Sequence, residues 1–143
     1  MIRMRTVGSR LILFYINMRI TISMLEKLVQ MAEKDAEVLA VIAFGSFARG
    51  ERHSDIDVCL VLKEKKANLD TSRKRLDYLS EFPDLDIHVF QQLPLHIRAR
   101  ILKEGKVLFC RDKNILYDIF YKTIKDFVYF EPKYRIYLGV DNG

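Results

Sequence analysis

Two aspartates interrupt an otherwise apolar segment, and this pattern constrains the fold more than any other feature of the chain. Residues 55–62 read DIDVCLVL, and the apolar run that follows the aspartates predicts a buried β-strand. Side chains alternate between the two faces of a strand, so Asp55 and Asp57 share one face. Carboxylates are rarely buried without a partner, and two on one face repel each other. The pair therefore predicts a bound cation. Mg²⁺ is well suited because it takes a few carboxylate oxygens and keeps positions for water and phosphate.

A glycine–serine turn stands shortly before this strand. Residues 37–44, EVLAVIAF, form an unbroken apolar run that ends at Gly45 and predicts another buried strand. Gly45 lets a ligand approach the backbone closely, and Ser46 is suited to cap a short helical turn. Free N–H groups at such a helix start can hold phosphate, with the Ser46 hydroxyl as a further donor and Arg49 as a nearby cation. The segment GSFARG lacks the Gly-Lys-Ser/Thr ending of a Walker loop.

A third aspartate lies within a later apolar segment. Residues 85–90, LDIHVF, predict a third strand with Asp86 in its interior. On an isolated strand, Asp86 would be an ordinary half-exposed residue. Beside the DID strand it would complete a cluster of three carboxylates, which can hold two metal ions for an in-line phosphoryl displacement. His88 follows on the same face of that strand and is expected to border the cluster.

The remaining segments alternate between helical and extended patterns. Helices are expected over residues 22–35, 63–82 and 93–105, a strand over 106–110, and a last helix that Asp112 or Asn114 caps. In the second of these helices, Leu69, Leu76 and Leu79 form the apolar stripe. This alternation predicts an α/β or mixed α+β fold, with a central sheet flanked by helices.

Composition narrows the class of protein. The chain has 143 residues, 50% hydrophobic and 30% charged, which predicts one folded domain rather than a disordered chain. A net charge of +5 favours anionic ligands such as nucleotides, but it also fits an ordinary solvated surface, so we do not expect nucleic acid as a direct ligand. Cys59 and Cys110 lie far apart within apolar runs, which predicts reduced thiols in a cytoplasmic protein. The apolar run at 11–16 is too short to span a bilayer.

The chain divides into three parts on these patterns. Residues 1–21 form an N-terminal arm that is open to three interpretations: an extra strand, a partner-binding arm, or a start codon assigned too early. Residues 22–112 carry the motifs, and residues 113–143 form a helical extension rich in aromatic residues. Its rings are Tyr117, Phe120, Tyr121, Phe127, Tyr129, Phe130, Tyr134 and Tyr137. Half of them would pack on the sheet and the rest would form a surface for a protein partner, in preference to stacking on RNA.

The order of these motifs resembles a known family. GSFARG, then DID, then a strand aspartate is similar to the nucleotidyltransferases of the DNA polymerase beta superfamily. The segment LDIHVFQQLPLHIRARILKEGKVLFCRD resembles the minimal nucleotidyltransferases in particular. The resemblance covers about residues 24–112 and implies a polymerase-beta-like palm with a mixed central sheet.

The resemblance also implies a role for each motif residue. Gly45 and Ser46 would hold the triphosphate, and Asp55 and Asp57 would bind metal ions. Asp86 would bind the second metal ion and help to deprotonate the acceptor hydroxyl. The implied reaction transfers a nucleoside monophosphate and releases pyrophosphate. AMP from ATP is the favoured choice of nucleotide.

The family resemblance further implies a partner. Members of this size often pair with a HEPN ribonuclease toxin and, as its antitoxin, adenylylate one of its tyrosines. Eight residues separate Ser46 from Asp55, fewer than is usual in the family, so a binding module that neutralises its partner without catalysis is the alternative. Transfer to a small molecule or an RNA end is a third interpretation, although such enzymes usually carry an additional substrate domain. A homo-oligomer is compatible with all three.

Overall fold

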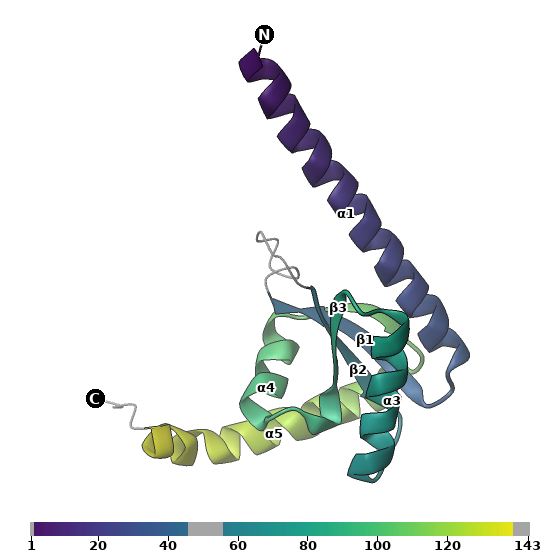
Figure 1. Ribbon diagram of the computed structural model, residues 1–143. Helices are drawn as coiled ribbons and strands as arrows, with labels where there is room; N and C mark the ends of the chain where they lie inside the picture. The colour runs from purple at the N-terminus through teal and green to yellow at the C-terminus, as the bar shows by residue number, and fades with distance from the viewer. Residues whose placement is uncertain (1, 46–55, 139–143) are drawn as a thin grey trace.

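The computed structural model describes residues 2–45 and 56–138 of the chain (Figure 1). Its helices are α1 (Ile2–Lys34), α3 (Asn68–Glu81), α4 (Leu95–Glu104) and α5 (Lys113–Leu138), with a short 3₁₀ turn η1 (Phe90–Gln92). Its strands are β1 (Val38–Phe44), β2 (Ile56–Leu62), β3 (Leu85–Val89) and β4 (Lys106–Cys110). Every strand expected from the apolar runs is present within a residue or so of its expected bounds.

The four strands form one mixed sheet in the order β3-β2-β1-β4. β1 pairs with β2 and with β4 in antiparallel fashion, whereas β2 and β3 run parallel. The parallel pair needs a crossover connection, which α3 provides. This architecture confirms the expected mixed central sheet flanked by helices.

Both faces of the sheet are covered, which explains why the central strands read as continuous apolar runs. On one face, Leu28 of α1 and Tyr78 of α3 pack with Val58 and Leu60 of β2. The opposite face forms a second cluster, in which Ile101 of α4 and Leu116 of α5 pack with Cys59 and Val61 of β2 and Ile42 of β1. Since side chains alternate along β2, Asp57 points to the same side as Cys59 and Val61.

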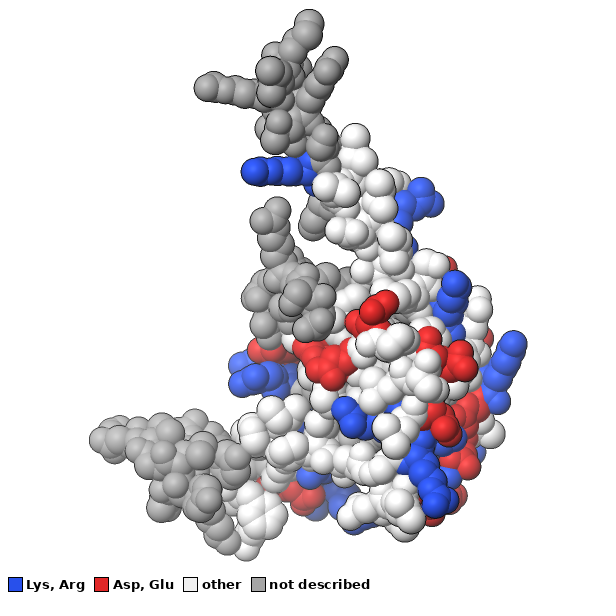
Figure 2. Space-filling model, in the orientation of Figure 1, with Lys and Arg blue, Asp and Glu red and all other residues white. Residues whose placement is uncertain are grey.

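Helix α1 is much longer than the amphipathic segment expected at 22–35. It continues without a break across residue 21, so the interpretation of the N-terminal arm as an extra strand is wrong. A helix of 33 residues is about 50 Å long, and Figure 1 shows its N-terminal part projecting from the body. This part exposes Leu11, Ile12, Leu13, Tyr15, Ile16, Met18, Ile20 and Ile22. It shows largely uncharged surface in Figure 2. In the part of the chain that is described, no helix, α1 included, meets the length and hydropathy that crossing a membrane requires.

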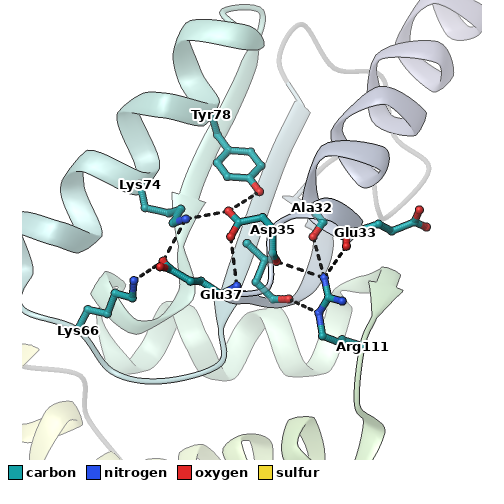
Figure 3. A network of polar contacts seen from close by, with 9 residues as sticks. Ala32, Glu33, Asp35, Glu37, Lys66, Lys74, Tyr78 and Arg111 are labelled. Atoms are coloured by element: carbon teal, nitrogen blue, oxygen red, sulfur yellow. Dashed lines mark hydrogen bonds and ion pairs between the residues drawn. The ribbon is translucent and has the colours of Figure 1, made fainter.

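A polar network fixes the C-terminal end of α1 to α3 (Figure 3). Asp35 accepts hydrogen bonds from Lys74 Nζ at 2.8 Å, from Tyr78 Oη at 3.0 Å and from the Glu37 backbone N–H at 3.1 Å. Glu37 also forms ion pairs with Lys74 and Lys66. Tyr78, which lies on the buried face of α3, is thereby satisfied at its polar end.

Two further side chains close helix ends. The guanidinium of Arg111 donates to the backbone carbonyls of Ala32, Glu33, Asp35 and Val38 (Figure 3). Ala32 and Glu33 belong to the last turn of α1, where carbonyls lack helical i+4 partners, and Asp35 and Val38 belong to the turn and the strand that follow, so Arg111 fastens the end of α1 to the start of β1. Asp112 Oδ1 accepts from the backbone N–H groups of Asn114 and Ile115, so Asp112, and not Asn114, caps α5.

Candidate active site

The site begins with two carboxylates on neighbouring strands. Asp57 of β2 and Asp86 of β3 are direct partners in the parallel pair. Each stands between buried residues that point to the other face: Ile56 and Val58 in β2, Leu85 and Ile87 in β3. The strand period therefore brings both carboxylates out on the same face of the sheet, at the beginning of both strands.

The turn at the end of β1 lies directly against Asp57. Phe44, the last residue of β1, pairs with Asp57, and Gly45 follows with a backbone φ of +75°. A β-carbon at position 45 would overlap the Asp57 carboxylate. Only glycine combines this left-handed backbone with so close an approach. The sequence predicted that Gly45 would let a ligand approach the backbone. In the structure, the group that approaches Gly45 is the Asp57 carboxylate, which could itself bind a metal ion.

His88 adds an imidazole to the two carboxylates. Its Nε2 lies 3.0 Å from Asp86 Oδ1, and its ring packs against Phe44 with the ring centroids 5.9 Å apart. The side chain of Asp86 is 47% exposed and that of His88 is 27% exposed, so solvent and a ligand can reach both. The sequence placed His88 beside the cluster, and the structure shows that it contacts Asp86 directly.

Opposing influences act on the Asp86 carboxyl. Partial burial would raise its pKa, but hydrogen bonds with His88 and Asp57 and electrostatic interactions with His88 and Arg75 together lower the pKa below its ordinary value. Arg75 is fixed by its Nε, which donates to the carbonyl of Ile87 at 2.7 Å. Asp86 is therefore held as an anion next to a second carboxyl group. Two carboxyls this close either share a proton or take a cation between them.

The described side chains can hold a divalent ion. Asp57, Asp86 and His88 each offer one ligand atom, and these atoms all lie within 4.8 Å of one another. Carboxylate oxygens suit Mg²⁺ and Mn²⁺, and imidazole is a common ligand of transition metals. The donor set therefore fits the metal chemistry that the sequence motifs predict.

The sequence-predicted site residues fall into two groups. Gly45, Asp57 and Asp86 converge on one place in the structure, as described above. The other three, Asp55, Ser46 and Arg49, lie outside the described residues. Sequence reasoning missed Phe44 and Arg75, because only the strand pairing and the docking of α3 bring them to the cluster.

The mixed sheet thus places two carboxylates of parallel strands beside a glycine turn, and comparison with known proteins assigns the family. The family model described as "Polymerase beta, Nucleotidyltransferase" matches residues 26–114, well over half of the chain. The chain belongs to this family and is a nucleotidyltransferase, which confirms the resemblance seen in the motifs.

A curated protein supports the same assignment. The chain is 35% identical over 92 residues to a protein of Methanocaldococcus jannaschii named "Putative protein adenylyltransferase MJ1547". The match covers 63% of this chain and 70% of that protein.

Solved structures share the fold. A chain of a toxin–antitoxin crystal structure with AMP-PNP superimposes with a TM-score of 0.60 at 18% identity, covering 80% of this chain and 95% of that one. A second match is to the structure of a tri-AMPylated Shewanella oneidensis HEPN toxin in complex with an MNT antitoxin. Its TM-score is 0.57 at 16% identity, covering 80% of this chain and 90% of that one. At these identities the comparison establishes the fold.

Proposed function

We propose that this nucleotidyltransferase transfers AMP from ATP to a hydroxyl group of a protein in a Mg²⁺-dependent reaction. The observation that carries the proposal is the alignment of Asp57 with Asp86 directly beside Gly45. The name of the M. jannaschii relative supports a protein acceptor. We expect the reaction to occur in the cytoplasm, because it consumes ATP and both cysteines are free thiols.

Each residue has a proposed task in this reaction. Asp55, Asp57 and Asp86 would hold two metal ions, and these ions would supply positive charge to the phosphates and to the departing pyrophosphate. Gly45 admits the triphosphate to the backbone of the turn, with Ser46 and Arg49 as further phosphate contacts. The acceptor oxygen forms a bond to the α-phosphorus, the bond from that phosphorus to the pyrophosphate oxygen breaks, and Asp86 takes the hydroxyl proton.

The proposed acceptor is a HEPN-type ribonuclease toxin, with this chain as its antitoxin. Support comes from the matching structures, which are described as toxin–antitoxin complexes. An exposed apolar stripe on α5 offers a surface for such a partner, formed by Tyr117, Tyr121, Ile124 and Val128. These residues recur at intervals of four, three and four, which aligns them on one side of the helix while Leu116 and Thr123 are buried on another.

A transfer assay tests the proposal. The purified chain is incubated with ATP labelled in the α-phosphate, Mg²⁺ and the protein encoded beside it. We expect label on that protein, and a loss of at least about 100-fold in Asp57→Asn, since charge-stabilising groups of an active site contribute on that scale. Asp77→Asn, an exposed carboxylate on α3, is the matched control and should retain full transfer. Equal transfer by Asp57→Asn, or no transfer by the wild-type chain with Mg²⁺ or Mn²⁺, would refute the proposal.

The second candidate is a partner-binding module without catalysis, which the exposed stripe on α5 favours. Under this alternative a double variant, Asp57→Asn with Asp86→Asn, still protects cells from the toxin. Loss of protection while the complex still forms would exclude the binding module. Transfer of label to RNA 3′ ends or to a small molecule in the same assay would instead favour the third interpretation.

A further inference from the structure

His88 lies beside the two carboxylates of the candidate metal site. Its Nε2 is 3.0 Å from Asp86 Oδ1, and its ligand atom and those of Asp57 and Asp86 all lie within 4.8 Å of one another. In an octahedral site with ligands about 2.1 Å from the ion, neighbouring ligand atoms are about 3 Å apart and opposite ones about 4.2 Å apart. The observed separations need only a small adjustment to surround one ion.

The surroundings of the ring support this arrangement. His88 points to the same face as Asp86 because the two alternate along β3 with the buried residues Leu85, Ile87 and Val89. The ring of Phe44 packs on the imidazole at an interplanar angle of 55°. Contacts with Phe44 on one side and Asp86 on the other fix the direction of the ring. A ligand fixed before the ion arrives loses less entropy when it binds.

We propose that His88, with Asp57 and Asp86, coordinates one of the two metal ions and gives this site a preference for transition-metal ions over Mg²⁺. The inference rests on the metal-dependent function proposed above. Mg²⁺ binds oxygen ligands and holds its waters tightly, whereas an imidazole nitrogen adds affinity for first-row transition metals. Mn²⁺, which accepts both carboxylate and imidazole ligands, is the probe for this preference.

The same 3.0 Å separation also fits a role in which the imidazole only donates a hydrogen bond from Nε2 to Asp86. The two roles differ in where the imidazole proton resides. As a ligand, the neutral ring presents Nε2 to the ion and carries its proton on Nδ1; as a donor, it keeps the proton on Nε2. A measurement that detects a metal–nitrogen bond separates them.

Electron paramagnetic resonance of the full chain with Mn²⁺ alone, without nucleotide, provides that measurement. Continuous-wave spectra give the Mn²⁺ affinity, and pulsed spectra report whether an imidazole nitrogen is bound to the ion. We expect a bound nitrogen in the wild-type chain and its loss in His88→Gln. In that variant the Mn²⁺ affinity should fall at least about tenfold, and the affinity for Mg²⁺, measured by competition, should fall much less. Replacement of the other histidines, His53→Gln and His96→Gln, should leave the nitrogen signal in place, which assigns the signal to His88.

The outcomes separate this inference from the proposed function. Bound Mn²⁺ without a nitrogen signal in the wild-type chain overturns the role of His88 as a ligand, whatever the variants do, and leaves the transferase proposal intact if label transfer persists. A nitrogen signal that survives in His88→Gln overturns the assignment in the same way. A chain that binds neither Mn²⁺ nor Mg²⁺, with or without ATP, contradicts the proposed function itself.

Discussion

Gly45 and Asp57 lie in such close contact that no other residue fits at position 45 without displacing the carboxylate. The contact follows from the antiparallel pairing of β1 with β2, which places Phe44 opposite Asp57. Position 45 also requires glycine because its backbone φ is +75°, a conformation that residues with a side chain rarely adopt. The missing side chain at position 45 thus leaves room for the Asp57 carboxylate, in addition to any ligand that binds at the turn.

Gly45→Ala should therefore damage the site more than the fold. The left-handed backbone costs a non-glycine residue about 1–2 kcal/mol, and the new methyl group must displace the Asp57 carboxylate. We expect a modest decrease in melting temperature and a loss of metal binding and label transfer of at least about tenfold, measured by calorimetry, Mn²⁺ titration and the transfer assay.

A second glycine provides the matched control for this variant. A β-carbon on Gly105, at the end of α4, would lie 2.5 Å from the Ile101 carbonyl oxygen and 2.7 Å from Ile42 Cγ2. Gly105 directly precedes β4, the strand at the edge of the sheet opposite to β3. Gly105→Ala should destabilise the chain while the remaining folded protein binds Mn²⁺ normally. Equal loss of metal affinity in both variants would show that the effect of Gly45→Ala is a general loss of stability.

Sequence reasoning could predict the strands because the sheet is buried on both faces. Continuous apolar runs bounded by Gly45 or by charged residues leave few alternatives, and β4 occupies residues 106–110 as expected. The alternation of side chains also placed Asp86 and His88 on one face correctly. Which residue lies beside which across strands depends on register, and no local pattern announces that Asp57 is opposite Asp86.

The helices were harder to predict because their burial depends on specific tertiary contacts. On α3, Leu69 and Leu76 of the expected apolar stripe are exposed, while Thr71 and Tyr78 are buried. Tyr78 can be buried because its hydroxyl donates a hydrogen bond to Asp35, 43 residues earlier in the chain. The extension of α1 to Ile2 was missed because its exposed half lacks the amphipathic pattern that marks a helix packed on a core.

The Asp35 network should make stability depend on acid pH. Burial would raise the pKa of Asp35, but hydrogen bonds from Lys74, Glu37 and Tyr78 together lower it below the ordinary value of 3.8. A carboxyl group with a lowered pKa in the folded state stabilises the fold above the unfolded pKa, and this contribution disappears as the pH falls through the folded pKa. Melting temperatures measured from pH 7 to pH 2 should therefore drop below about pH 4.

Asp35→Asn tests whether Asp35 is responsible for that drop. The variant removes one of the two carboxylates that pair with Lys74, the other being that of Glu37, so we expect a loss of about 1–3 kcal/mol at pH 7 and a shallower decline below pH 4. The exposed Asp70→Asn on α3 should behave like the wild-type chain in both respects. An acid transition that is as steep in Asp35→Asn as in the wild-type chain would assign it to other carboxylates.

Arg111 should be irreplaceable by lysine. Its Nε and Nη2 donate to four backbone carbonyls at 2.9–3.2 Å, a geometry that requires the planar guanidinium. Arg111→Lys keeps the charge but loses most of these bonds, and we expect a loss of about 1.5–3 kcal/mol. Hydrogen exchange should accelerate over residues 30–35, at the end of α1, whereas the exposed Arg73→Lys should change neither quantity. Unchanged exchange at this helix end would mean that the Asp35 network and the packing of Leu28 and Ala32 hold α1 in place without Arg111.

The stripe on α5 should be the surface that binds the partner protein. Tyr121 is 66% exposed and lies at the centre of the stripe, so Tyr121→Asp removes an aromatic contact and buries a charge in the proposed interface without affecting the core. We expect a loss of at least about 2 kcal/mol in binding, roughly thirtyfold in Kd by calorimetry, with an unchanged melting temperature. Leu69→Asp, which places the same charge at an equally exposed apolar residue of α3, should bind normally. If Tyr15→Asp on the projecting part of α1 abolished binding and Tyr121→Asp did not, the partner would bind α1 instead, because that helix also exposes a row of apolar residues.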